Sequence, residues 1–291
     1  MDRCQLSNIS NVFSFINVIY IRTEIAGGPY LKETYFAGID VGTSHIKVVL
    51  IDGSDEVRGS HIRRSGADLQ ASISTAFEEA MANAGAIPDD VVYTVATGFG
   101  RGNVTFGDES KTEISCHARG AHHYFPGRLT IIDIGGQDTK VIKIDDVGKT
   151  IRFRMNRKCA AGTGAFLEEI AHKLDIPMDE MNALAHKSTK DTALGSYCTV
   201  FASTEILTRI REGENVEDMA KSAFESVARR VIEMDSLEGR IVMTGGVVAY
   251  NDIVKTILER HTGNEILVPP EPQLIGAFGA ALFAKEAKLE S

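Results

Sequence analysis

Two of the four cysteines stand where a thiolate could serve as a metal ligand. Cys159 precedes a glycine turn and a helix in NRKCAAGTGAF, and Cys198 precedes another expected helix in GSYCTVF, with Thr199 as the expected N-cap. A helix N-terminus stabilises a thiolate through its unpaired N–H groups and its macrodipole, which lower the pKa of the thiol. Each cysteine taken alone also fits a small core residue. As a pair they look poised as ligands.

The number of thiols restricts what such a site could hold. Two thiolates are too few for a [4Fe–4S] cluster, which normally takes four. A zinc ion with two outside ligands is an alternative, but His172 and His186 have no CxxC companion and no zinc-ligand spacing. If two subunits each gave two sulfurs across a two-fold axis, one cluster would have its four ligands. Under that hypothesis the site is complete only in a dimer.

Two loops that begin with an aspartate have the residue types of a phosphate site. Asp40 and Asp133 each stand just before a glycine turn, where a carboxylate could hold Mg²⁺ through waters or orient an attacking water. Glycine permits tight turns whose N–H groups face an anion. The donors in the two loops are Gly42, Thr43, Ser44, Gly135, Gly136 and Gln137. A structural turn explains either loop alone, whereas a facing pair indicates a phosphate clamp.

A third glycine loop, Gly245-Gly246, follows an expected strand over residues 240–244. A strand that ends in two glycines before a helix lets a flat ring approach the backbone closely, although an ordinary strand-to-helix turn has the same pattern. The sequence has no GxxxxGK[ST] motif, so a P-loop NTPase is not indicated.

The two aspartate loops belong to an internal repeat. Residues 39–52 align without gaps onto residues 132–145, with seven of fourteen positions identical. Each copy reads as a strand, a polar turn and a second strand, which predicts two equivalent β-hairpins. Lys47 and Lys140 occupy matching positions beyond the turns. From the sequence they are equally well phosphate contacts or solvated charges.

The rest of the chain alternates strands and helices, which predicts an α/β fold with two related lobes. We expect lobes over residues 35–127 and 128–291, with the C-terminal helix able to pack back on the first lobe, and an extension outside the fold over residues 1–34. Helices are expected at 67–84, 113–124, 162–174, 178–186, 199–211, 216–235, 250–261 and 273–288, with further strands at 91–97, 240–244 and 265–268.

Composition excludes some classes of function. A net charge of −9 with acidic residues spread along the chain argues against nucleic acid or an anionic membrane as a partner. The apolar run at residues 12–21 is too short to span a bilayer. The sparse cysteines fit thiols kept reduced in the cytoplasm better than a disulfide framework.

The motifs together resemble known families. IDVGTSHIK and IDIGGQDTK are similar to the two phosphate motifs of the actin, sugar kinase and Hsp70 ATPase superfamily, VMTGGV to its adenosine motif, and residues 276–280 to its second connecting helix. With MNRKCAAGTGAFLE, LGSYCTVFASTE and EISCHARGA, residues 36–284 resemble the CoA-enzyme activase family. That family comprises activators of 2-hydroxyacyl-CoA dehydratases and ATPase subunits of benzoyl-CoA reductases. The resemblance implies a two-lobed actin-like fold, duplicated and ribonuclease H-like.

The resemblance also implies which residues bind cofactors. In the family, cysteines at the positions of Cys159 and Cys198 ligate one [4Fe–4S] cluster between subunits, whereas Cys116 matches a position that is no ligand and Cys4 has no counterpart. ATP and Mg²⁺ are the other cofactors. The implied catalytic residues are Asp40, Asp133 and Gln137. The implied ATP-binding residues are Gly42, Thr43, Ser44, Lys47, Gly135, Gly136, Gly162, Gly164, Gly245 and Gly246.

By the same resemblance, the expected function is ATP-dependent electron transfer at low potential in anaerobic metabolism. Reduced ferredoxin or flavodoxin would be the donor, and a CoA-thioester dehydratase or reductase the recipient. The chain would pair with an identical chain or with a homologous ATPase subunit. A separate activator and a fixed reductase component both remain open. The rivals are an actin-fold small-molecule kinase without a cluster, an actin-like filament protein and an exopolyphosphatase.

Overall fold

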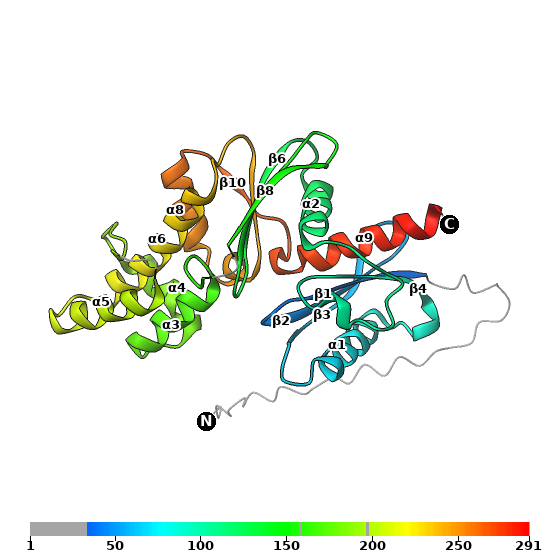
Figure 1. Cartoon of the computed structure of the whole chain (residues 1–291), viewed down its shortest axis with the longest axis horizontal. Coiled ribbons are helices and arrows are strands. Elements are labelled where there is room, and N and C mark those ends of the chain that lie inside the picture. Colours follow the sequence, from blue (N-terminus) through cyan, green and yellow to red (C-terminus); the bar gives the residue numbers. More distant parts are fainter. Residues whose placement is uncertain (1–33, 157–158, 196–197, 291) are drawn as a thin grey trace, which may run out of the picture. The chain divides into compact units, whose positions relative to one another are not determined.

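The computed structural model places two β-sheets in the chain, with helices packed on both faces of each (Figure 1). It describes residues 34–156, 159–195 and 198–290. The strands are β1 (Tyr35–Val41), β2 (His45–Ile51), β3 (Val57–Arg64), β4 (Val91–Thr97), β5 (Glu109–Ser110), β6 (Leu129–Ile134), β7 (Thr139–Ile144), β8 (Thr150–Asn156), β9 (Ile241–Thr244) and β10 (Ile266–Leu267). The helices are α1 (Leu69–Ala84), α2 (Glu113–Tyr124), α3 (Gly164–Leu174), α4 (Met178–Lys187), α5 (Thr199–Arg211), α6 (Val216–Met234), α7 (Gly246–Tyr250), α8 (Ile253–Thr262) and α9 (Ile275–Glu290).

The two sheets have the same topology. The first has the order β3-β2-β1-β4-β5, and the second has the order β8-β7-β6-β9-β10. In each sheet the first three strands along the chain are antiparallel neighbours, and the fourth strand pairs parallel with the first. The duplication seen in residues 39–52 and 132–145 therefore extends over a whole sheet.

The register of the strands is duplicated as well. Asp40 lies opposite Lys47 between β1 and β2, and Asp133 lies opposite Lys140 between β6 and β7. A register shift follows at equivalent points of the second strands, between Leu50 and Ile51 and between Lys143 and Ile144. Since a bulge changes the direction of a strand, its repetition preserves the shape of each sheet.

Helices bury both faces of each sheet. Helix α1 covers one face of the first sheet and α9 the other, while α2 covers one face of the second sheet and the helices from α3 to α8 the other. Helices α2 and α9 touch directly at glycines, because a Cβ on Gly279 would stand 1.9 Å from the Cys116 carbonyl oxygen. The described residues belong to one compact unit.

Most of the expected elements are confirmed, and the differences have local causes. Strands β3 and β8 were missed, because they are edge strands with exposed, arginine-rich sequences. The helix expected at 250–261 starts at Ile253. The short helix α7 precedes it and is capped by Asn251, whose side-chain amide donates to the Val247 carbonyl. The final helix begins at Ile275, after a 3₁₀ turn.

The expected division of the chain stays a prediction. The first sheet takes its strands from residues 35–110 and the second from residues 129–267, and α9 packs on β1, β2 and β4. Apart from Thr34, the expected extension lies outside the described residues. In the described part of the chain, no helix has both the length and the apolar composition needed to cross a bilayer.

Candidate functional site

A cavity of about 500 Å³ is lined by residues that follow strands of both sheets. Its lining includes two of the expected catalytic residues, Asp40 and Asp133, and most of the residues expected to bind ATP, namely Gly42, Thr43, Ser44, Lys47, Gly135, Gly136, Gly164, Gly245 and Gly246. The turns of the two hairpins also come close to each other, since a Cβ on Gly136 would stand 2.6 Å from the Ser44 Oγ. The structure thus brings together the three glycine loops that the sequence placed far apart.

The first hairpin carries an aspartate with one open oxygen. Asp40 is 2% exposed, and its Oδ2 accepts from the Lys47 ammonium at 3.0 Å. Its Oδ1 is buried and has no hydrogen-bond partner among the described residues. Burial alone would lower the pKa of Lys47, but the adjacent Asp40 carboxylate, together with Asp133 and Glu113, raises that pKa. The pair therefore offers an acceptor oxygen and a cation to the cavity.

The second hairpin carries the same pair in a closed network. The Lys140 ammonium is fully buried and lies 3.0 Å from Asp133 Oδ2, 2.9 Å from Glu113 Oε1 and 2.9 Å from Asp138 Oδ1. Asp133 Oδ1 accepts from the Thr244 hydroxyl at 3.1 Å. Burial opposes the charged forms, yet the three carboxylates raise the pKa of Lys140, while His117 and Lys140 hold the pKa of Asp133 well below its usual range.

The alternative that Lys140 is a solvated charge is therefore wrong, because the side chain is 0% exposed and is surrounded by carboxylates. Lys47 keeps 17% of its side chain exposed and lines the cavity, so it has access to an anion there. The two matching lysines have different surroundings despite their matching register.

Each aspartate is covered by a glycine that follows the parallel neighbour strand. Gly98 (φ +87°) follows β4, and a Cβ there would stand 2.4 Å from Asp40 Oδ1. Gly245 (φ +99°) follows β9, and a Cβ there would stand 2.7 Å from Asp133 Oδ1. Such φ values and such contacts exclude an ordinary side chain. Both positions therefore require glycine so that the backbone can turn directly over the carboxylate.

Two cavity residues, Glu113 and His117, were not among the expected site residues. They lie one turn apart on α2, within EISCHARGA, and their ligand atoms lie within 4.8 Å of each other and of an Asp133 oxygen. Three such groups could hold a metal ion, but the Lys140 ammonium already contacts two of the carboxylates. The Glu-xxx-His spacing on a helix was the available sequence signal. Burial raises the pKa of Glu113 despite the opposing effect of Lys140.

The far side of the cavity has the character of a nucleoside site. Met178 and Asp179 in the first turn of α4, and Tyr250 and Asn251 at the end of α7, line it together with Gln273. An apolar surface with a few polar groups suits a flat base and a sugar.

Two of the expected site residues lie elsewhere. Gln137 lines a neighbouring cavity of about 460 Å³ rather than the main one. Gly162 does not line the main cavity; a Cβ there would stand 2.7 Å from Arg230 Cγ, and its carbonyl accepts from the Thr139 hydroxyl. Their expected roles stay predictions.

The two candidate ligand cysteines are exposed and precede neighbouring helices. Helices α3 and α5 pack together, and the Ser203 hydroxyl donates to Glu169 Oε1 at 3.3 Å between them. The expectation of Thr199 as N-cap is wrong, because α5 begins at Thr199 and Cys198 itself is the N-cap. Cys159 is further from its helix, since the N-cap of α3 is Thr163.

The start of α3 is bonded to the second hairpin. The Gly164 and Ala165 N–H groups donate to the Gly135 and Gly136 carbonyls at 2.9 and 2.7 Å. These two N–H groups are therefore not open to a thiolate or a phosphate, contrary to the expectation of unpaired groups ahead of this helix.

The remaining described cysteine differs from these two. Cys116 is buried on α2, and burial raises the pKa of its thiol to about 12. The thiol is thus protonated at neutral pH and unsuited to ligate a metal.

Comparison with known proteins identifies relatives along most of the chain. Residues 37–284 match the BadF/BadG/BcrA/BcrD ATPase family. The activator of lactoyl-CoA dehydratase from Anaerotignum propionicum is 40% identical over 87% of this chain and 98% of its own length. The 2-hydroxyisocaproyl-CoA dehydratase activator from Clostridioides difficile is 37% identical, covering 88% and 97%. A subunit of benzoyl-CoA reductase from Thauera aromatica is 29% identical, covering 86% and 93%.

Solved structures show the same fold. Component A of (R)-2-hydroxyglutaryl-CoA dehydratase from Acidaminococcus fermentans superposes with a TM-score of 0.84 at 38% identity, over 88% of this chain and 99% of that one. The 2-hydroxyisocaproyl-CoA dehydratase activator from Clostridium difficile with bound ADPNP gives 0.83 at 36% identity, over 88% and 96%. A glucokinase of the ROK family from Streptomyces griseus gives 0.55 at 14%, over 87% and 99%, which shows the fold alone. The expected actin-like fold is confirmed, and this chain belongs to the BadF/BadG/BcrA/BcrD ATPase family.

Proposed function

We propose that this protein is an ATPase that activates a CoA-thioester dehydratase by passing it electrons through a [4Fe–4S] cluster, held by Cys159 and Cys198 of each of two subunits. The observation that carries this proposal is the arrangement of the two exposed cysteines. They precede the packed helices α3 and α5, and the first N–H groups of α3 donate to carbonyls in the turn of the second hairpin.

The ATPase part rests on the cavity between the two hairpins. Asp40 is the residue best suited to orient the attacking water or a water on Mg²⁺, because its Oδ1 is buried, anionic in the Lys47 pair and unpartnered among the described residues. Lys47 would attract the phosphates, and the glycine turns at Gly42 and Gly136 would donate N–H groups to them. Asp133, with both oxygens engaged, would maintain the negative charge that holds Lys140.

The rest of the cavity receives matching roles. Gly245 and Gly246 would let the adenosine approach the backbone, and Gly164, which has no side chain, would leave room for the phosphates where it lines the cavity. Gln137, at the tip of the second hairpin, remains a proposed catalytic residue that would have to reach the phosphates from the neighbouring cavity.

The donor set fits an iron–sulfur cluster. Thiolates are the usual ligands of [4Fe–4S], and two exposed cysteines from each of two chains would supply four. When bound, a cluster there would supply one-electron redox chemistry at low potential, with a reduced ferredoxin or flavodoxin as the donor and the partner enzyme as the acceptor. The chain's own residues hold the sulfurs ahead of α3 and at the N-cap of α5, and the bonds from Gly164 and Ala165 connect α3 to the nucleotide cavity.

The kinship favours a separate dehydratase activator over a fixed component of a reductase. Dehydratase activators are 37–40% identical to this chain, whereas the benzoyl-CoA reductase relative is 29% identical. A small-molecule kinase shares the fold with this chain at only 14% identity, and it would leave both cysteine motifs without a role. We place the protein in the cytoplasm as a homodimer, where reduced donors and CoA thioesters are available.

Anaerobic purification with iron quantitation and EPR tests the proposal. We expect half a [4Fe–4S] cluster per chain, lost in Cys159→Ser and in Cys198→Ser. Cys4→Ser and Cys116→Ala are the matched controls and should keep the iron. A cluster that survives in both ligand variants, or a protein that hydrolyses ATP but never holds iron, would overturn the electron-transfer part. Activity with a sugar acceptor in place of iron would support the kinase.

A further inference from the structure

The segment that leads into Cys198 has no regular secondary structure, yet it is held in place. Residues 188–195 connect the end of α4 to the loop before α5. Loops are more mobile than helices and strands, so the contacts that restrain this segment bear on where Cys198 can be.

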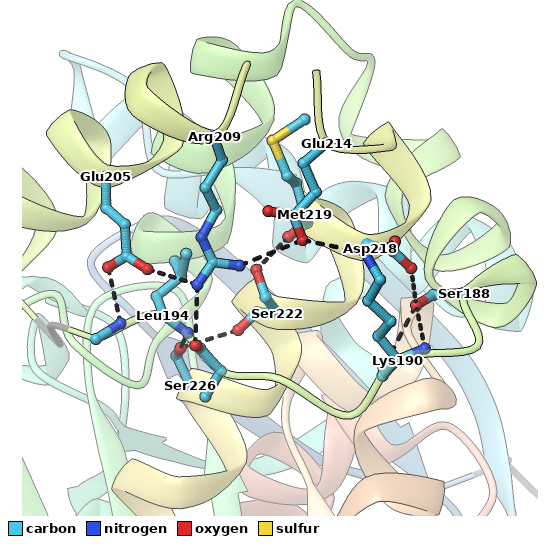
Figure 2. A network of polar contacts seen from close by, with 12 residues as sticks. Ser188, Lys190, Leu194, Glu205, Arg209, Glu214, Asp218, Met219, Ser222 and Ser226 are labelled. Atoms are coloured by element: carbon cyan, nitrogen blue, oxygen red, sulfur yellow. Dashed lines mark hydrogen bonds and ion pairs between the residues drawn. The ribbon is translucent and has the colours of Figure 1, made fainter. Parts of the chain in front are cut away.

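Backbone groups of three consecutive residues in this segment bond to side chains of α5 and α6 (Figure 2). The Ala193 carbonyl accepts from Arg209 Nη2 at 3.2 Å, and the Leu194 N–H donates to the Ser226 Oγ at 3.0 Å. The Gly195 N–H donates to Glu205 Oε2 at 2.7 Å. Such side-chain bonds to backbone groups restrict a loop more than surface ion pairs do, because they fix the main chain itself.

Glu205 and Arg209 act in this network as one unit. Figure 2 shows their side chains next to each other on α5, where Glu205 Oε1 accepts from Arg209 Nη2 at 2.5 Å. Each also bonds the loop, and Arg209 lies 3.7 Å from Glu214 Oε1. Charge-assisted hydrogen bonds of this kind are stronger than neutral ones.

Their place on the helix gives the network a direct bearing on Cys198. Glu205 follows Cys198 by seven residues, about two helical turns, so both lie on one side of α5. The helix that begins at Cys198 therefore reaches back through Glu205 to hold Gly195, three residues before Cys198. Cys198 thus lies in the sequence between Gly195 and Glu205, two residues that are bonded to each other.

We infer that Glu205 and Arg209 are positioning residues that fix Cys198 by holding the backbone of residues 193–195. This inference rests on the proposed function, since it gives these two side chains a role in cluster binding. It also makes a statement about the polypeptide alone, namely that the order of the chain at Cys198 depends on this pair whether or not a cluster is bound.

The same segment offers a matched control. Lys190 pairs with Asp218 at 2.8 Å, and Ser188 donates to the same carboxylate at 2.7 Å. These contacts are also side-chain bonds to α6, but they hold the far end of the segment, eight to ten residues before Cys198. Lys190 also lies 3.9 Å from Glu214 Oε1, which Arg209 contacts, so Ser188 is the cleaner control. Ser188→Ala should leave Cys198 unchanged, whereas Glu205→Ala and Arg209→Met should not.

A nitroxide label on the full-length chain measures the order at each cysteine. In a Cys4→Ser, Cys116→Ala, Cys159→Ser background the label sits on Cys198, and in the reciprocal background with Cys198→Ser it sits on Cys159. We expect Glu205→Ala to increase the mobility of the label on Cys198 and not on Cys159, with Glu205→Gln closer to wild type because its carbonyl can still accept from Gly195. Equal loosening at both sites, or none, would overturn the inference.

Iron retention in the otherwise wild-type dimer is the second measurement. Removing the partner that orients a metal ligand typically costs 10- to 100-fold in metal affinity, so we expect iron loss to a chelator to be about tenfold faster in Glu205→Ala and Arg209→Met than in Ser188→Ala. Unchanged iron loss in both variants contradicts the inference. If the wild-type protein holds no iron, the proposed function fails, while the label measurement still decides whether this pair orders Cys198.

Discussion

The first and second hairpins have the same fold and the same Asp–Lys pair, but different residues surround that pair. In the first, Asp40 has one partner, and its second oxygen is open among the described residues. In the second, Asp133 bonds both Lys140 and Thr244, and Lys140 contacts two further carboxylates. The backbone has kept its duplicated register, whereas the side chains around it have diverged.

This difference indicates a division of labour within the duplicated site. An aspartate with an open oxygen can bind water or a metal-bound water, whereas one with both oxygens engaged contributes mainly fixed charge and rigidity. The divergence comes from neighbours outside the hairpins. Glu113 is supplied by α2, and Thr244 turns its hydroxyl to Asp133, while the equivalent Thr97 donates to the Lys111 carbonyl.

The largest expected difference is between the two lysines. Lys140→Met would leave three carboxylates without their shared cation in the protein interior, so we expect the free energy of unfolding to fall by about 3–5 kcal/mol. Lys47→Met should cost less, because it leaves one carboxylate rather than three without a cation and that carboxylate borders the cavity. Urea unfolding followed by circular dichroism measures both. Equal losses would mean that the second network is no more closed than the first.

The response to pH sharpens the same comparison. The depressed pKa of Asp133 contributes stability above its usual value of 3.8, which is lost as the pH falls through the depressed pKa. The raised pKa of Lys140 contributes stability below 10.5, which is lost as the pH rises through the raised pKa. The wild-type pair therefore stabilises the fold across the neutral range. In Lys140→Met the crowded carboxylates should bind protons more readily, so stability should rise as the pH is lowered from 8 to 5.

Substituting the two aspartates separates catalysis from stability. Asp40→Asn should lower kcat for ATP hydrolysis by about 10²- to 10³-fold, because an amide cannot accept or orient as the open carboxylate oxygen does. Its unfolding free energy should change little, since Lys47 can reach solvent. Asp133→Asn should instead lower both quantities. Phosphate-release assays and urea unfolding on the same preparations give the two numbers, and a stable, fully active Asp40→Asn protein would refute the assignment.

The two covering glycines should behave alike, because the duplication is intact in the backbone. Gly98→Ala and Gly245→Ala each force a Cβ into a carboxylate oxygen at a positive φ. We expect each to cost about 1–3 kcal/mol of unfolding free energy. A control at Gly53, where a Cβ would meet no atom within 4 Å, should cost much less. Clearly unequal effects at Gly98 and Gly245 would show that the backbones have diverged as well.

The smallest expected difference concerns the two threonines. Thr244→Val removes a hydrogen bond to the Asp133 carboxylate and should cost about 1 kcal/mol. It should also move the midpoint of acid unfolding to higher pH, since the pKa of Asp133 would rise. Thr97→Val removes a bond to a neutral carbonyl, so its acid midpoint should match that of the wild type. Acid titrations monitored by circular dichroism distinguish the two.

The two hairpins could be predicted from the sequence, but the residues that surround them in the fold could not. Asp, Gly and Lys repeat at fixed spacing in residues 39–52 and 132–145, so the turns and the pairing of strands could be predicted. The third strand of each sheet, β3 or β8, could not, because these edge strands are rich in arginine and lack the alternating apolar pattern. The repeated bulge shows that these strands are nonetheless part of the duplication.

The state of each charged residue depended on contacts that only the fold creates. Lys140 is buried because Glu113, 27 residues earlier, is brought over it by α2. No local pattern distinguishes it from Lys47. The same reason separates Gly162 from Gly164, two glycines of one motif, of which only the second lines the main cavity.

The two bonds from the start of α3 to the second hairpin act as a rigid joint. Gly164 and Ala165 are adjacent in the chain, and so are their acceptors Gly135 and Gly136, so the pair of bonds fixes an orientation as well as a distance. A phosphate that tilts this turn must therefore either tilt the whole of α3 or break both bonds together. The turn and α3, the helix that follows Cys159, therefore move as one rigid body, so a small rotation of the turn gives a larger displacement along the helix.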